Sequence, residues 1–250
     1  RGENEISRLN TNFNLMTAEI KHLMDQNLEE QRQKRKSELM ALQAQINPHF
    51  LYNTLDSIIW MAEWGKNKEV VTMTSSLAKL LRQSISNQNE MVRVEDEVEY
   101  TRSYLVIQKM RYKDKLEYDI VVEPKILDFR VAKLILQPLV ENAIYHGIKY
   151  KEGKGKVLVE GFLRGSELIL RITDNGIGMN EQRLAQIFEK RETDRKRNSV
   201  GVLNVHERIR LYYGKEYGLT FESVEGMGTK VEIHIPYMEA KTGETDGSEK

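Results

Sequence analysis

The stretch that decides the fold spans residues 137–147 and reads Gln-Pro-Leu-Val-Glu-Asn-Ala-Ile-Tyr-His-Gly. It lies at the end of a helix predicted over about residues 131–147. In such a helix Asn142 and His146 stand four residues apart and therefore share one face. That face carries an amide and an imidazole, both of which can contact a ligand.

Three glycine-containing runs follow this helix. Residues 174–179 read Asp-Asn-Gly-Ile-Gly-Met at the end of a predicted strand, Gly201 opens a predicted helix, and residues 226–229 read Gly-Met-Gly-Thr before the last predicted strand. Alone, each run is more typical of a turn that needs a positive φ than of a phosphate site. Their order and spacing together favour a nucleotide site.

After about residue 115 the sequence combines short strand-like segments with helical segments, which predicts a sheet covered by helices. Strands with alternating polarity are predicted over residues 116–122, 156–163, 168–173, 219–223 and 229–235. Helices are predicted between them over residues 131–147 and 202–213. This mixture indicates an α+β sandwich, one sheet covered by helices, rather than an alternating βαβ fold with a parallel sheet.

The N-terminal half has helical periodicity instead. Apolar residues from Ile6 to Leu23 follow a heptad seam, and the pattern returns from Leu39 to Ile46, which predicts a coiled coil. A second helix is predicted over residues 70–87, after a turn at residues 65–68, and a linking helix over residues 95–111. Helices in hairpin order suggest half of a four-helix bundle completed by a second copy, and hence a homodimer.

Composition removes several classes of function. The 38 basic and 38 acidic residues cancel, so no overall field favours nucleic acid as a partner. The absence of cysteine excludes disulfides, thiolate catalysis and cysteine-based metal sites. No apolar run approaches the roughly 20 residues that span a bilayer. A membrane connection is therefore expected only through segments absent from this chain.

The run at residues 137–147 and the three glycine-containing runs resemble the N-box and glycine boxes of the GHKL ATP-binding fold. Histidine kinases, type II topoisomerase subunits, an ATP-dependent heat-shock chaperone and mismatch-repair ATPases share this fold. The resemblance covers about residues 134–236 and implies ATP and Mg²⁺ as cofactors. One departure is Ser199, because many histidine kinases have a glycine two residues before the one that matches Gly201.

Resemblance and side-chain chemistry together assign roles to the candidate residues. The Asp174 carboxylate is expected to accept a hydrogen bond from the exocyclic amine of adenine, with Thr229 supporting that contact through its hydroxyl and water. Asn142 is expected to offer a neutral carbonyl oxygen to Mg²⁺. The other candidates are Gly176 and Gly178 beside the base and sugar, His146 and Lys149 on the phosphate side, and the N–H groups around Gly201. The polar residues between 179 and 200 are expected to form a lid.

Residues 47–53 read Asn-Pro-His-Phe-Leu-Tyr-Asn and resemble the phosphoacceptor box of the histidine-kinase subfamily that includes the YesM and LytS sensors. Pro48 is expected to kink the helix beside His49. A neutral imidazole can attack the γ-phosphoryl group of ATP, and Asn53, four residues after His49, can orient the ring. Other histidine kinases have an acidic residue where Phe50 stands, so no general base is assigned.

The resemblance also implies a domain order and a partner. Residues 1–28 are expected to form the second helix of a HAMP-like relay and signalling coiled coil, and residues 29–113 the helical dimerisation and phosphotransfer region. Residues 114–237 are expected to form the GHKL-type ATP-binding domain, and residues 238–250 a disordered tail. The implied partner is a response regulator whose aspartate receives the phosphate. The implied location is the cytoplasmic portion of a bacterial cell-membrane protein.

The resemblance to the GHKL fold leaves two alternatives to histidine kinase activity. ATP-hydrolysing GHKL proteins carry a catalytic glutamate four residues before the metal-binding asparagine, where this chain has Pro138. Glu141 is adjacent to Asn142 and points elsewhere on the helix, so it is a poor substitute. The second alternative is a dimeric scaffold that binds nucleotide weakly or not at all. The intact Asp174, Asn142 and His49 argue against it.

Overall fold

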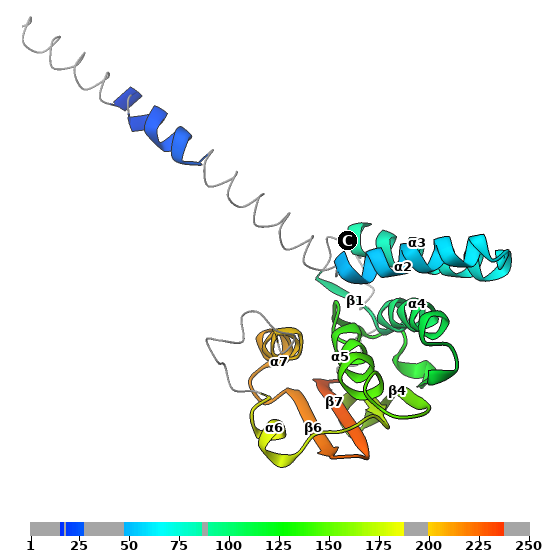
Figure 1. The fold of residues 1–250 in the computed structure, drawn as a ribbon. Coiled ribbons are helices and arrows are strands. Elements are labelled where there is room, and N and C mark those ends of the chain that lie inside the picture. The colour runs from blue at the N-terminus through cyan, green and yellow to red at the C-terminus, as the bar shows by residue number, and fades with distance from the viewer. Residues whose placement is uncertain (1–15, 18, 28–47, 87–89, 188–199, 238–250) are drawn as a thin grey trace, which may run out of the picture. The chain divides into compact units, whose positions relative to one another are not determined.

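The computed structural model describes residues 16–17, 19–27, 48–86, 90–187 and 200–237 (Figure 1). The chain divides into two compact units, residues 1–53 and 54–250. The N-terminal unit is helical wherever it is described, and its seam residues Met16, Ile20 and Leu23 are each more than half exposed. This exposure agrees with a helix that requires a partner. The rest of the predicted seam, the expected kink before Pro48 and the predicted tail at residues 238–250 lie outside the described residues.

The helices predicted over residues 70–87 and 95–111 are confirmed. Helix α2 (Pro48–Glu63) and helix α3 (Asn67–Ser86) are joined by a tight turn in which Gly65 has a φ of 67°. Glycine suits this left-handed conformation, because it has no Cβ to clash with the backbone. Helix α3 packs on helix α4 (Val94–Tyr112), which is the predicted linking helix.

A sheet of five strands forms the core of the C-terminal unit, in the order β2-β4-β5-β7-β6. The strands are β2 (Leu116–Val122), β4 (Gly155–Arg164), β5 (Glu167–Asp174), β6 (Gly218–Val224) and β7 (Gly228–Pro236). Only the β2–β4 pair is parallel among these neighbours. Apolar side chains such as Val159, Ile172 and Ile233 are buried on the face that the helices cover (Figure 1). The predicted α+β sandwich is therefore confirmed.

The opposite face of the sheet carries an ion-pair network, because side chains alternate between the two faces along each strand. Glu232 on β7 is 6% exposed and accepts hydrogen bonds from Arg164 on β4 and Arg171 on β5. The two guanidinium groups hold the pKa of Glu232 down at about 2, against the opposing effect of its burial.

The helix predicted over residues 131–147 begins later than expected, and its first six positions were wrong. Strand β3 (Arg130–Ala132) pairs antiparallel with β1 (Met91–Arg93), and helix α5 (Gln137–Asn142) starts only after residue 136. The chain then widens into a π-helical turn, η3 (Ala143–Ile148), in which the Lys149 N–H donates to the Ile144 carbonyl. The apolar side chains of residues 131–136 are thus buried by tertiary packing rather than by a helical face.

The remaining elements are short, apart from the last helix. They are the 3₁₀ turns η1 (Lys113–Lys115) and η2 (Pro124–Ile126), the unpredicted helix α6 (Glu181–Ala185), and helix α7 (Val200–Tyr213). Helix α7 agrees with the predicted helix over residues 202–213. None of the helices in the described ranges is long and apolar enough to cross a membrane.

Candidate functional site

A cavity of about 500 Å³ lies between the helices and one end of the sheet. Helix α5, turn η3, the chain after β5, helices α6 and α7, and strands β6 and β7 all contribute to its wall. Its polar lining residues are Asn142, His146, Asp174, Arg183, Gln186 and Thr229. Its apolar lining includes Leu139, Ile172, Val202, Phe221 and Val231. A largely apolar pocket with a few convergent polar groups is typical of a small-molecule site.

Asp174 stands at the end of β5, is 6% exposed and points an acceptor into this cavity. Its Oδ1 accepts a hydrogen bond from the Gly176 N–H at 2.8 Å, and the Thr229 N–H also donates to the carboxylate. Burial raises the pKa of Asp174 to about 6, although these two N–H groups and the charge of Lys151 counteract the shift. At pH 7 the site therefore holds a desolvated carboxylate that can accept from an amine.

The Thr229 hydroxyl is oriented by a small hydrogen-bond network. Ser223 Oγ donates to the Gly228 carbonyl at 2.9 Å and accepts from the Met179 N–H at 2.9 Å. Thr229 Oγ1 lies 2.9 Å from the same Ser223 Oγ. Because the single Ser223 proton is already used, Thr229 donates to Ser223. The lone pairs of Thr229 are then left to accept from a ligand or a water in the cavity.

The glycines of residues 174–179 allow close packing of backbone against backbone. A Cβ at Gly176 would meet the backbone of Gly147, and one at Gly178, where φ is 64°, would meet the Val224 carbonyl. Gly178 lines the cavity, whereas Gly176 lies outside it and lines a neighbouring hollow. Gly147 was missed as a site residue, although a Cβ there would lie 2.6 Å from Asp174 Oδ1. Its position at the end of the run 137–147 could have marked it.

Asn142 and His146 both line the cavity, as their spacing predicted. Burial, followed by the nearby charges of Arg183 and Lys149, lowers the pKa of His146 below its ordinary value of 6.5. The imidazole is therefore neutral at pH 7. It can donate or accept a hydrogen bond there, but it supplies no positive charge for a phosphate.

Lys149 is not brought to the cavity wall. Its side chain is exposed, and its Nζ lies 5.5 Å from the ring centre of Tyr150 and 6.0 Å from that of Tyr145. Among the described residues, Arg183 on α6 is the lysine or arginine that lines the cavity. Arg183 belongs to the stretch predicted to form a lid, but the five residues of α6 gave no periodic signal that would mark this side chain.

Gly201 is the second residue of α7 and is followed directly by the lining residue Val202. Among the described residues beyond its own helix, the nearest atom to a Cβ built on Gly201 is Pro138 Cβ, at 3.7 Å, which is ordinary van der Waals contact. Residues 180–187 of the predicted lid are described and contain α6, whereas its residues 188–199, including Ser199, lie outside the described residues.

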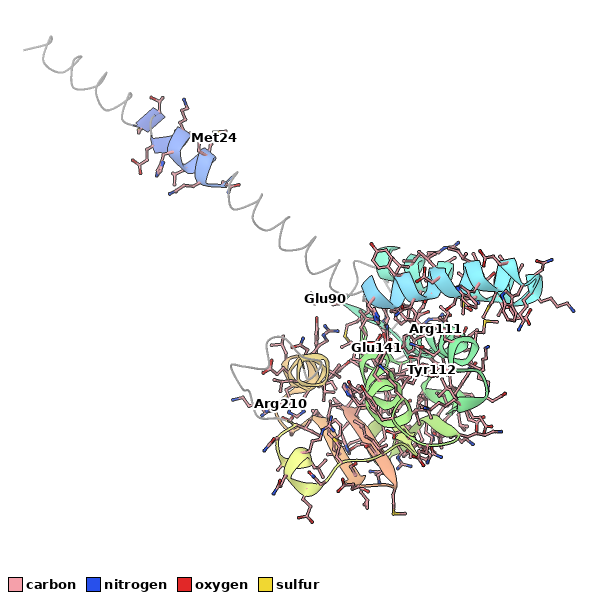
Figure 2. The ribbon with its side chains drawn as sticks, viewed as in Figure 1. Met24, Glu90, Arg111, Tyr112, Glu141 and Arg210 are labelled. Atoms are coloured by element: carbon pink, nitrogen blue, oxygen red, sulfur yellow. The ribbon has the colours of Figure 1, made fainter. Side chains whose placement is uncertain are left out.

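Glu141 turns away from the cavity, as its position beside Asn142 predicted. Its Oε1 accepts a hydrogen bond from Gln137 Nε2 at 2.7 Å, and burial raises its pKa. Figure 2 shows Glu141 on the side of α5 where α4 presents Arg111 and Tyr112, and α4 and α5 are in contact. Glu141 is thus in no position to activate a water in the cavity.

His49 and Asn53 form a contact within α2. The Asn53 amide nitrogen lies 3.1 Å from Nε2 and 3.2 Å from Nδ1 of His49, and the imidazole is exposed to solvent. The predicted pairing at a spacing of four residues is therefore present. It joins an accessible imidazole to an amide that can hold its orientation.

Two protein-family models match the chain. Residues 37–116 match the model described as histidine kinase, and residues 128–239 match the model described as histidine kinase-, DNA gyrase B-, and HSP90-like ATPase. The second match contains every residue found lining the cavity, and the first contains His49 and Asn53.

Curated relatives align with most of the chain. Sensor histidine kinase YesM of Bacillus subtilis is 36% identical over 94% of the chain, and sensor histidine kinase YpdA of Escherichia coli is 34% identical over 80%. Sensor protein LytS of Bacillus anthracis is 29% identical over 84%. The chain spans 39%, 34% and 35% of the lengths of these relatives, respectively.

Solved structures of histidine kinases are also similar. The catalytic domain of histidine kinase ThkA is 18% identical, with a TM-score of 0.44, over 58% of this chain and 93% of that one. The histidine kinase domain of the blue-light activated kinase of Erythrobacter litoralis is 15% identical, with a TM-score of 0.45, over 79% of this chain and 92% of that one.

Proposed function

Because the chain belongs to the sensor histidine kinases that resemble YesM and LytS, we propose that it transfers the γ-phosphoryl group of ATP to its own His49. A response-regulator aspartate then receives the group. The observation that carries the donor half of this proposal is the convergence of Asp174, Thr229, Asn142 and His146 on one cavity. The acceptor half is supported by the exposed imidazole of His49 and its contact with Asn53.

In the proposed complex the adenine ring lies at the Asp174 end of the cavity. The buried carboxylate accepts from the exocyclic amine, and the Thr229 hydroxyl accepts from a bridging water. Guanine presents a carbonyl at the corresponding position, and a buried carboxylate would repel it. The apolar walls around Ile172 and Phe221 exclude water from the base.

Mg²⁺ fits the chemistry of the cavity through a single protein ligand. No group of three or more His, Cys, Asp or Glu residues that could hold a metal occurs in the described ranges. Asn142 lines the cavity and offers a neutral carbonyl oxygen, so phosphate oxygens and water would supply the other ligands. When bound, Mg²⁺ neutralises charge on the phosphates. Neutral His146 and the cation Arg183 contact the same region of the ligand.

In the transfer step, a lone pair of one His49 ring nitrogen attacks the γ-phosphorus. A nitrogen–phosphorus bond forms, the bond from phosphorus to the bridging oxygen breaks, and ADP leaves with that electron pair. Rotation of the Asn53 side-chain amide by half a turn would bring its carbonyl oxygen to the N–H of the His49 ring. This contact would fix the tautomer and leave the other nitrogen to react.

The residues around Asn142 favour transfer of the γ-phosphoryl group to His49 over hydrolysis of ATP. Pro138 cannot activate water, and Glu141 is held by Gln137 away from the cavity. Within the part of the chain that the structure describes, no carboxylate other than Asp174 lines the cavity, and we assign Asp174 to the base.

The wider assignments follow from the family. We assign residues 1–28 to a HAMP-like helix and signalling coiled coil, residues 29–113 to dimerisation and phosphotransfer, and residues 114–237 to ATP binding. The working unit is a homodimer, and a response regulator is its phosphate acceptor. The chain is the cytoplasmic portion of a bacterial membrane protein whose membrane segments lie outside this sequence.

Incubation with γ-labelled ATP and Mg²⁺ tests the proposal. The native chain is expected to acquire label that is labile to acid and stable to base. His49→Gln and Asn142→Asp are expected to acquire none, whereas His22→Gln, which changes another exposed helical histidine, retains it. Acid-labile label on His49→Gln at the native level would overturn the assignment of His49.

A further inference from the structure

A buried carboxylate on α4 binds three consecutive backbone N–H groups just before α5. Glu97 is 2% exposed. Its Oε1 accepts from the Leu134 N–H at 2.6 Å, and its Oε2 accepts from those of Ile135 and Leu136 at 3.0 and 3.2 Å. Burial raises the pKa of Glu97, and the three N–H groups counteract that shift. A carboxylate with three charge-assisted hydrogen bonds is a strong anchor for the chain that it holds.

The same turn is held from the other side by α7. Arg208 Nη1 donates to the Lys133 carbonyl at 2.6 Å. This carbonyl and the Leu134 N–H belong to one peptide group, so Arg208 and Glu97 bind its opposite ends. The Ala132 N–H donates to the Tyr213 hydroxyl of α7 at 2.9 Å. Three elements, α4, the β3–α5 turn and α7, therefore meet at this peptide.

The backbone of the turn is itself constrained. Leu134 has a φ of 59°, a left-handed conformation that is strained for a residue other than glycine. The hydrogen bonds of Glu97 compensate for that strain. Without them the turn would relax toward ordinary φ values, and the start of α5 would move with it.

Helix α5 carries this constraint to the cavity. Leu136 immediately precedes α5, whose Leu139 and Asn142 line the cavity wall. The far end of the helical segment has a separate anchor, because the Gly147 carbonyl accepts from the Ile177 N–H and Gly147 packs against Asp174. Loss of the Glu97 anchor would release the Asn142 end of the segment and leave the Asp174 end in place.

We infer that Glu97 is a positioning residue that holds Asn142 in register with the phosphates of Mg·ATP, and that Arg208 serves the same turn from α7. The inference rests on the proposed function, because Mg·ATP is the ligand. Glu97 touches neither nucleotide nor metal. It acts through the peptide groups that begin α5.

Glu97→Gln tests this role. The substitution replaces one carboxylate oxygen by an amide NH₂ group, so a side-chain donor would face the backbone N–H donors of the turn. Binding of Mg·ATP and of adenosine would be measured by isothermal titration calorimetry, with melting temperatures recorded for each variant. Mg·ATP affinity is expected to fall by about tenfold, the loss typical of removing an outer partner of a metal ligand. Adenosine lacks the phosphates, so its affinity should change by less than about twofold.

Glu232→Gln is the matched control. It neutralises another buried carboxylate, in the ion-pair network on the opposite face of the sheet. It is expected to lower the melting temperature without changing either affinity. Equal losses for Mg·ATP and adenosine in Glu97→Gln, or no loss for either, would refute the positioning role.

Arg208→Met decides the case in which Glu97→Gln does not fold. It removes the donor to the Lys133 carbonyl and leaves Glu97 intact, and it should weaken Mg·ATP by about threefold with adenosine unchanged. Unchanged affinity for both ligands in a folded Arg208→Met protein would then refute the role. Failure of the native chain to bind Mg·ATP would refute the proposed function instead.

Discussion

Asp174→Asn is expected to make the ligand-free protein more stable while weakening its binding of ATP. The carboxylate titrates at about 6 in the folded protein, against an ordinary value of 3.8. Between these two values the unfolded chain has released the proton and the folded chain has kept it. The free energy of unfolding therefore falls as pH rises through this window, and the full penalty is present above about pH 6.

The size of the effect follows from the shift. The difference between about 6 and 3.8, at about 1.4 kcal/mol per pKa unit, is a penalty of about 3 kcal/mol at pH 8. An amide avoids this penalty but accepts more weakly from the Gly176 and Thr229 N–H groups, so the net gain should be about 1–2 kcal/mol. ATP affinity should fall by about 10- to 100-fold, because the charge-assisted contact with adenine is lost.

Urea unfolding at pH 4.5, 6 and 8 without nucleotide would measure the gain, and calorimetry would measure ATP binding. The stability advantage of Asp174→Asn should be largest at pH 8 and should nearly vanish at pH 4.5. Glu232→Gln gives the opposite sign, because the pKa of Glu232 is held at about 2 and its ionised form stabilises the fold above pH 4.5. An Asp174→Asn variant that is equally destabilised at all three pH values would refute the reasoning.

Three further substitutions test close packing and backbone strain. Gly147→Ala would put a Cβ 2.6 Å from Asp174 Oδ1 and should weaken ATP binding by at least about tenfold. Gly161→Ala is the control, because the three atoms nearest to its Cβ are apolar side-chain atoms at 3.0–3.2 Å. It should cost about 1–3 kcal/mol of stability and leave ATP binding unchanged. Equal ATP affinities for the two variants would contradict this account of Gly147. Lys113→Gly should raise the free energy of unfolding by about 1 kcal/mol, measured in urea, because Lys113 is exposed with a φ of 52° at the end of α4. An unchanged or lowered urea midpoint would show that the conformation of Lys113 carries no strain.

The sheet could be predicted from the sequence because its signal is local. The alternation within residues 116–122 depends only on neighbouring residues, and β2 has those same bounds. Strands β1 and β3 have three residues each and pair Val92 with Val131 across a long stretch of chain. Three residues carry no measurable period, so the sequence suggested a helix at residues 131–136 instead.

The site was predictable where residue type, spacing and strand ends coincided. Asn142, His146, Asp174, Gly178 and Thr229 line one cavity because a helix face and the adjacent ends of β5 and β7 bring them there. Nearness in sequence was a poorer guide, and Lys149 illustrates this. Three residues after His146, the π-helical turn has ended, and the side chain lies against tyrosine rings rather than at the cavity.

Helix α4 shows why the role proposed for Glu97 could not be predicted from the pattern of apolar residues in the sequence. Its buried positions include four polar side chains with helical spacing, Glu97, Thr101, Tyr104 and Gln108. Burial of a polar group without a partner is costly, and a carboxylate needs several partners. The partners of Glu97 are backbone N–H groups, which every sequence offers at every residue except proline. A buried glutamate therefore indicates that an anchor exists, but only the structure identifies the turn before α5 as the segment that it holds.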